Sequence, residues 1–115
     1  MFELVWLEPA NQKYEELEVA AKRSLDNREK NKKAKASPSE GLFKQIDKCV
    51  EFLRSNPRHP GLSTHEFDAL NHPYDSKQKI FEAYVQNRTP GAYRVFWCYG
   101  PGKNQITIIA ITPHP

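Results

Sequence analysis

The stretch "AYRVFWCYGPGKNQITIIAIT" (residues 92–112) decides the fold, because two apolar runs flank a Gly-Pro-Gly turn. Runs rich in Val, Ile, Phe, Tyr and Trp are typical of strands, and a five-residue connection containing glycine suits an antiparallel hairpin. We therefore predict strands over residues 92–99 and 105–112. Arg94 interrupts the first strand and His114 follows the second, so both residues require an explanation.

A third strand precedes this hairpin in the sequence. The segment "KIFEAYVQ" (residues 79–86) alternates in the manner of a strand, and "NRTPG" (residues 87–91) is a turn. Residues 56–76 are rich in proline and histidine and are predicted to form an irregular connection. Connections of this length inside a compact domain are often functional.

The motif "SPSE" (residues 37–40) predicts the start of a helix. Ser37 can cap the helix, Pro38 suits the first helical position, and Glu40 completes a capping box. Apolar residues then recur at helical spacing from position 42 to position 53. The helix is expected to end before Pro57, because proline cannot continue it.

The N-terminal part is predicted to be a strand followed by another helix. "FELVWL" (residues 2–7) has one largely apolar face and one mixed face, as a strand requires. Pro9 ends this strand and suits the first turn of a helix, whose apolar positions run from Tyr14 to Leu25. Acidic residues near its start and basic residues near its end complement the helix dipole.

The predicted fold class is α+β, with elements in the order β-α-α-β-β-β. An N-terminal strand, a helical hairpin and three antiparallel strands form a single sheet, with both helices packed on one face. A chain of 115 residues, of which 38% are hydrophobic, suits one domain over residues 1–115.

Composition excludes several classes of protein. No stretch approaches the roughly 18 consecutive apolar residues of a membrane helix. The segment "MFELVWLEPA" carries no basic region and does not resemble a signal peptide. Cys49 and Cys98 lie in apolar segments far apart in sequence, so we expect a buried reduced pair in a cytoplasmic protein rather than a disulfide.

The net charge of +3 is unevenly distributed. Residues 1–21 have a balance of −4, whereas the basic run over residues 22–35 has a balance of +5. A concentrated basic segment suits a polyanion-binding surface. The alternative is an exposed helix end, where lysine and arginine are favourable for the dipole alone.

The "YR" of "AYRVFWCY", the histidine of "IAITPHP" and the order of elements together resemble the RelE/ParE superfamily of bacterial type II toxins. The resemblance covers nearly the whole chain. It implies a metal-independent, ribosome-dependent mRNA endonuclease that blocks translation, needs no cofactor and is held inactive by a cognate antitoxin. Its expected partners are therefore the antitoxin, the ribosome and mRNA.

Metal-independent RNA cleavage must deprotonate the 2′-hydroxyl, stabilise charge on the phosphate and protonate the leaving 5′ oxygen. Arg94 suits the phosphate and His114 suits proton transfer, with Arg88 in the preceding turn as a further catalytic candidate. Strict alternation would put Arg94, Phe96 and Cys98 on one face of their strand. It would put Ile106, Ile108, Ala110, Thr112 and His114 together on the next strand, although register decides whether the two faces coincide.

Candidate RNA-binding residues come from the basic run, the long connection and the strands. They are Lys22, Arg23, Lys30, Lys32, Lys33, His65, Lys79 and Tyr99. The three histidines at positions 59, 65 and 72 are spaced too widely for a typical zinc site, so no metal is expected. Strand aromatics can stack on bases but more often belong to a core.

Simpler alternatives remain for each of these residues. Arg94 can pair with Glu82 of the neighbouring strand, and His114 can be a loose terminal residue. Pro115 stands where many nuclease members carry a tyrosine, which favours a non-catalytic ParE-like gyrase inhibitor or RNA-binding relative. A protein-interaction module without nucleic-acid contacts would bind its partner independently of salt.

Overall fold

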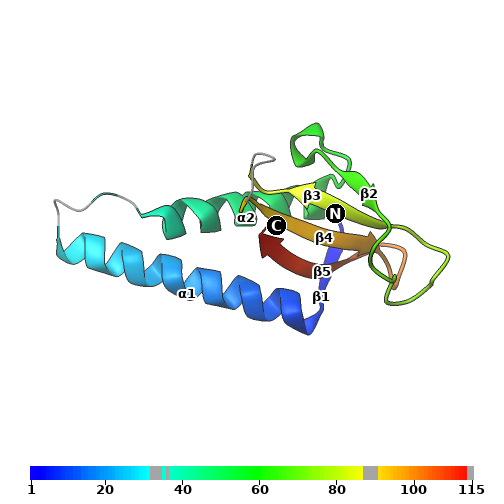
Figure 1. Cartoon of the computed structure of the whole chain (residues 1–115), viewed down its shortest axis with the longest axis horizontal. Helices are drawn as coiled ribbons and strands as arrows, with labels where there is room; N and C mark the ends of the chain where they lie inside the picture. The colour runs from blue at the N-terminus through cyan, green and yellow to red at the C-terminus, as the bar shows by residue number, and fades with distance from the viewer. Residues whose placement is uncertain (32–34, 36, 87–90, 114–115) are drawn as a thin grey trace.

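The chain folds into a five-stranded sheet with a helical hairpin on one face (Figure 1). The computed structural model describes residues 1–31, 35, 37–86 and 91–113. The elements are β1 (Glu3–Trp6), α1 (Glu8–Lys30), α2 (Pro38–Ser55), a 3-10 turn (Pro60–Leu62), β2 (His65–Phe67), β3 (Ile80–Tyr84), β4 (Tyr93–Tyr99) and β5 (Gln105–Pro113).

The strand order is β1-β5-β4-β3-β2, and only β1 and β5 run parallel. The predicted α+β class and the order of its six elements are therefore confirmed. The prediction of an entirely irregular connection over residues 56–76 is wrong, because it contains β2. This strand has only three residues, "HEF", so no apolar alternation marks it in the sequence.

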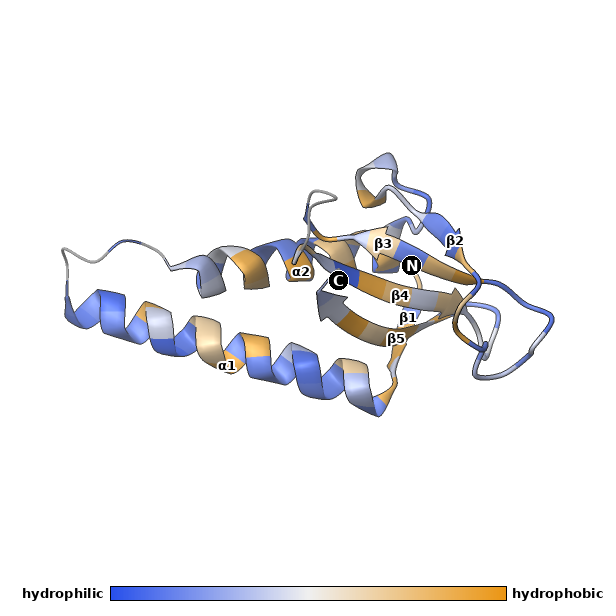
Figure 2. Ribbon diagram, in the orientation of Figure 1, coloured by the Kyte–Doolittle hydropathy of each residue, from blue (hydrophilic) through white to orange (hydrophobic). Residues whose placement is uncertain are grey.

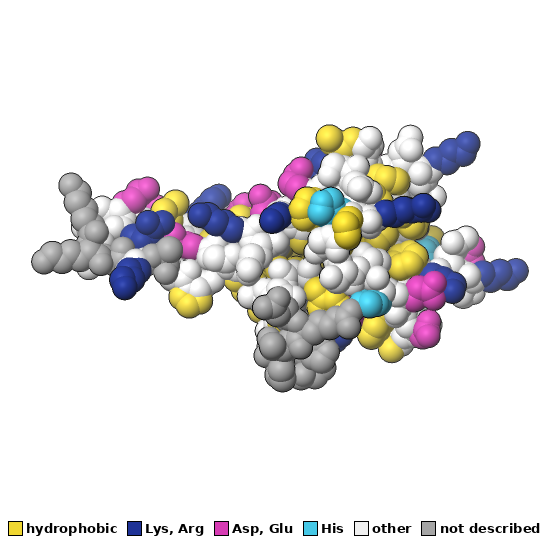
Figure 3. Space-filling view, turned by 90° about the horizontal axis from the view of Figure 1, so that it is seen from above, with side chains coloured by type: hydrophobic (Ala, Val, Ile, Leu, Met, Phe, Trp, Pro, Cys, Tyr) yellow, Lys and Arg dark blue, Asp and Glu magenta, His cyan; other side chains and the backbone are white. Residues whose placement is uncertain are grey.

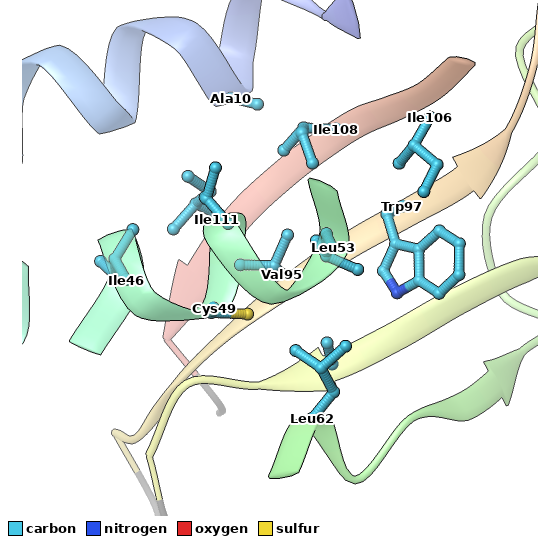
Figure 4. Packing of buried hydrophobic residues seen from close by; sticks show 12 residues of the cluster. Ala10, Ile46, Cys49, Leu53, Leu62, Val95, Trp97, Ile106, Ile108 and Ile111 are labelled. Carbon is cyan, nitrogen blue, oxygen red and sulfur yellow. The ribbon is translucent and has the colours of Figure 1, made fainter. Parts of the chain in front are cut away.

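The core lies between the hairpin and the sheet. Ala10 of α1 and Ile46 and Leu53 of α2 face Val95 of β4 and Ile108 of β5, all of them fully buried (Figure 4). Figure 2 shows the central strands largely hydrophobic, whereas α1 carries only short apolar patches among polar residues. Burial against the sheet, more than intrinsic propensity, therefore holds the helices in place.

The hairpin extends well beyond the sheet, and the molecule measures 52 × 27 × 24 Å (Figure 1). Polar contacts tie α1 to α2 near the far end. Glu40 accepts hydrogen bonds from the Arg28 guanidinium (2.6 Å), the Ser24 hydroxyl (2.8 Å) and the Ser37 backbone N–H (3.1 Å). Ser37 in turn accepts from the Glu40 backbone N–H, which confirms the predicted capping box. The Arg28 contact foremost, with those from Ser37 and Ser24, lowers the pKa of Glu40 to about 2.

An extra residue in β5 changes which side chains share a face. Phe96 pairs with Ala110, but the next residue, Trp97, pairs with Ile108, so Ile109 has no partner in the register. A bulge of this kind interrupts the alternation of a strand. The prediction that alternate residues from Ile106 to Thr112 share one face is therefore wrong. Ile106 and Ile108 face the helices, whereas positions 110 and 112 lie on the opposite face.

The two cysteines lie on opposite sides of the sheet. Cys49 of α2 belongs to the core under the helices, whereas Cys98 pairs with Thr107 and faces away from them. Both are buried and unbridged, which confirms the predicted free pair. Burial raises the pKa of Cys49 to about 12 and that of Cys98 to about 11. Within the described residues, none of the helices is both long and apolar enough to cross a membrane.

Replacing Glu40 by glutamine should destabilise the protein in a pH-dependent way. The pKa of Glu40 is lower in the folded protein than the ordinary value of about 4.3. Its ionised form therefore stabilises the fold above that ordinary value, and the contribution disappears as the pH falls towards 2. Thermal unfolding of wild type and Glu40→Gln should differ most at pH 7 and converge near pH 2.

Glu29→Gln is the matched control, because Glu29 is exposed in the last turn of α1. It makes the same change in charge without touching the cap. A difference between wild type and Glu40→Gln that is equally large at pH 2 and pH 7 would contradict the role of the ionised carboxylate.

Both thiols should be inert in the native protein, because burial disfavours the thiolate that reacts. A thiol-reactive chromogenic disulfide should label far less than one group per native chain over minutes. In guanidinium chloride it should label both cysteines at once. Rapid labelling of either native thiol would show that the surrounding core opens readily.

Candidate functional site on the outer face of the sheet

The candidate site lies on the face of the sheet turned away from the helices, here called the outer face. Register places two rows of side chains across it. One row runs from His65 of β2 through Glu82 of β3 to Phe96 of β4. The next runs from Tyr84 through Arg94 to Thr112 of β5.

The connection between β2 and β3 covers one end of the outer face. The Tyr74 hydroxyl lies 2.9 Å from the hydroxyl of Thr107, which in turn donates to the Gly100 carbonyl. This cover helps to explain why Cys98, the cross-strand neighbour of Thr107, is buried. The other end, which carries Arg94, remains partly exposed.

A nearly buried ion pair forms the centre of the site. Arg94 Nη1 donates to Glu82 Oε2 over 2.6 Å, and the two side chains are only 14% and 7% exposed. The guanidinium carbon lies 4.7 Å from the Phe96 ring centroid and 5.7 Å from that of Phe67. Arg94 is thus held between a carboxylate and aromatic rings, and it makes the ion pair with Glu82 that the sequence offered as an alternative.

The arrangement leaves hydrogen-bonding capacity on both partners. A guanidinium carries five N–H donors, and the contact with Glu82 uses one of them. Arg94 Nε is buried without a hydrogen-bond partner among the described residues. A carboxylate likewise accepts several hydrogen bonds. The pair can therefore bind an anion through Arg94 while Glu82 accepts a proton beside it.

His65 lies on the outer face rather than in a loop. Its exposed ring meets the Tyr84 ring edge-on, with 5.9 Å between the centroids. Its register partner is Glu82. The structure thus brings two sequence candidates, Arg94 and His65, onto one surface with a carboxylate between them.

Tyr99 and Lys79 lie elsewhere. Tyr99 pairs with Ile106, whose side chain faces the helices, so Tyr99 is on the opposite side of the sheet from Arg94. Tyr99 and Lys79 line a separate pocket of about 290 Å³ together with Phe81. The Lys79 ammonium already pairs with Glu66 at 2.8 Å. The outer-face site therefore contains neither residue.

The described part of the basic run belongs to the second half of α1. Lys22 lies 3.8 Å from Glu18, whereas Arg23 and Lys30 are exposed without an ion pair among the described residues. Figure 1 shows this end of α1 pointing away from the sheet. Acidic and basic side chains are interspersed on the face drawn in Figure 3. These basic residues therefore lie towards the far end of the hairpin, beyond the sheet.

Four sequence candidates lie outside the described residues. They are Lys32, Lys33, Arg88 and His114. Their roles stay predictions. Within the described residues, no group of three or more His, Cys, Asp or Glu side chains is arranged to hold a metal ion.

Glu82 is the site residue that sequence reasoning treated only as a structural partner. The signal for a larger role was present, because Glu82 stands between Phe81 and Ala83 in a strand. An acid between two apolar neighbours in a strand is rarely buried unless it is paired. What the sequence did not reveal is that β2 adds His65 to the same row.

Solved structures share this fold over nearly the whole chain. A YoeB/ParE toxin from Agrobacterium tumefaciens superposes with a TM-score of 0.59 at 11% identity, covering 98% of this chain and 99% of the other. Archaeal RelE, in its complex with RelB from Pyrococcus horikoshii, gives 0.56 at 11%, covering 97% and 93%. A copper-bound mutant toxin from Helicobacter pylori gives 0.51 at 11%, covering 99% and 96%.

The chain therefore has the fold of RelE/ParE toxins, as the sequence resemblance implied. No family model matches its sequence, and no curated protein matches it. At 11% identity these structures establish the fold, whereas the activity must be argued from the site.

Removing one member of the ion pair should cost more stability than removing both. Arg94→Ala leaves the Glu82 carboxylate buried without its partner, so the free energy of unfolding should fall by about 3 kcal/mol. The double variant Glu82→Leu with Arg94→Met should recover most of that loss. Urea unfolding of the single and double variants measures both effects. A loss below about 0.5 kcal/mol for Arg94→Ala would show that the pair is solvated.

Proposed function

We propose that this chain is the toxin of a toxin–antitoxin pair and cleaves mRNA on the ribosome without a metal ion. The observation that carries the proposal is the Arg94–Glu82 pair on the outer face. The fold shared with toxin structures supports the same conclusion. A phosphate-binding group and a proton acceptor then stand side by side.

The pair supplies two of the three tasks of RNA cleavage. Glu82 accepts the proton of the ribose 2′-hydroxyl, whose oxygen attacks the adjacent phosphorus. Arg94 donates from its remaining N–H groups to the phosphate oxygens, where negative charge grows in the transition state. The bond from phosphorus to the 5′ oxygen breaks, which leaves a 2′,3′-cyclic phosphate and a 5′-hydroxyl.

The remaining sequence candidates act around this centre in the proposal. His114 and Arg88 are further groups for proton transfer and phosphate binding. Lys22, Arg23, Lys30, Lys32 and Lys33 contact ribosomal RNA at a distance from the cleaved bond, as a projecting hairpin permits. Lys79 and Tyr99 provide a separate RNA contact on the other side of the sheet.

A cognate antitoxin is the proposed protein partner. The archaeal RelE structure is a complex with RelB, and its fold is shared here. An antitoxin segment that folds on binding can cover the outer face or the hairpin and so exclude RNA. Action on translating ribosomes would place the protein in the cytoplasm.

A non-catalytic relative is the second candidate. The observation that favours it is that Arg94 has little exposed surface for a phosphate. Its side chain is only 14% exposed and is already bound to Glu82. A purely structural pair has this geometry too. Such a protein would bind RNA or inhibit gyrase in the manner of ParE without cutting mRNA.

Cell-free translation of a defined mRNA, with mapping of new 5′ ends, separates the two candidates. The wild type should cut mRNA on the ribosome. Glu82→Gln should slow cutting by about 10²–10⁴-fold, the usual contribution of a general base. Arg94→Lys, which keeps a cation beside Glu82 but loses the planar fork, should also be strongly impaired.

Glu51→Gln is the matched control, because Glu51 is exposed on α2 and its ion pair is with Arg54, which is not a candidate residue. It should cut at the rate of the wild type. If folded wild-type protein makes no cuts, the nuclease proposal is wrong, and gyrase inhibition becomes the next assay.

A further inference from the structure

We infer that His65 donates the proton to the leaving 5′ oxygen. This inference rests on the proposed nuclease activity and adds a third catalytic residue to the outer face. It assigns to β2 the task that the sequence pattern gave to His114.

The first observation is the register of the three strands. His65 is directly opposite Glu82, and Glu82 binds Arg94 of the next strand. Side chains paired across neighbouring strands have Cβ atoms about 4.5–5.5 Å apart. A carboxylate and an imidazole at that separation can flank one phosphate, with the carboxylate near the attacking oxygen and the imidazole near the leaving oxygen.

The second observation is that the His65 ring is available. Its nitrogen atoms make no hydrogen bond within the described part of the chain, and the residue is exposed. The other two described histidines are engaged. His59 accepts from the Gly61 N–H and stacks on Phe52, with 3.9 Å between ring centroids. His72 accepts from the N–H groups of residues 74 and 75.

The third observation is the charge around His65. Glu82 and Tyr84 of β3 face it from the neighbouring strand, and Arg94 of β4 lies beyond Glu82. The Glu82 carboxylate thus has the Arg94 guanidinium on one side and the His65 imidazole on the other. Tyr84 contacts the ring edge-on and limits its orientation.

The proposed step balances without a further reactant. Glu82 takes the 2′-hydroxyl proton as the oxygen–phosphorus bond forms. The protonated His65 gives its proton to the 5′ oxygen as the bond from phosphorus to that oxygen breaks. Glu82 then loses its proton to water and His65 regains one, which restores both groups for the next cleavage.

A leaving group that needs no proton tests this role. The cut site is first mapped on ordinary mRNA, and a second mRNA then carries sulfur in place of the 5′ bridging oxygen at that position. A thiolate leaves without protonation because its conjugate acid has a far lower pKa than an alcohol. His65→Ala should slow cleavage of the oxygen substrate by about 10²–10⁴-fold but the sulfur substrate by less than about tenfold.

The pH–rate profile provides a second readout. The profile of His65→Gln should differ from that of the wild type on the oxygen substrate and match it on the sulfur substrate. His65 is exposed, so both variants should unfold at the wild-type temperature. Glu51→Gln should behave as wild type on both substrates.

Each result has a defined meaning. If the wild-type protein does not cleave mRNA, both the nuclease proposal and this inference are wrong. If the wild type cuts, unchanged cleavage by His65→Ala overturns the inference alone. Equal losses on the two substrates also overturn it, because they indicate positioning rather than protonation. The inference is also overturned if the sulfur substrate restores cleavage by His114→Ala but not by His65→Ala.

Discussion

The pairing of β4 with β5, including the extra residue at Ile109, is the constraint on which the rest of the structure depends. It lets Ile106, Ile108 and Ile111 all face the helices and form the core. It also turns Thr112 towards the same face as Arg94. Strict alternation would have placed Ile108 and Ile111 on opposite faces, so the bulge serves the core and the outer face together.

The outer face retains charge where a purely structural sheet would bury apolar residues. A buried ion pair contributes little net stability, because desolvation offsets the attraction between the charges. Glu82 and Arg94 therefore add polar chemistry to the sheet without strengthening it much. The helical hairpin and the core beneath it supply the stability that lets the sheet carry this pair.

Sequence patterns predicted the features that short segments determine and missed those that depend on how the strands pair. The capping box at Ser37, the two helices and the strands over 79–112 follow from local propensity and spacing. The bulge at Ile109 and the edge strand containing His65 do not, because neither has an apolar signature and both are set by a neighbouring strand. For the same reason Arg94 was identifiable as a candidate, whereas its relation to Glu82, His65 and Tyr99 required the register.

The parallel pairing of β1 with β5 affects the order in which the sheet folds during synthesis. Glu3 pairs with Gln105, so the first strand reaches its place in the sheet only after the last one is available. Contacts between such distant positions form slowly, because a long loop must close first. During synthesis the helices can form early, yet the sheet that orders the outer face is completed late. In a growing chain the β1 edge of the sheet would thus stay unpaired until β5 had left the ribosome.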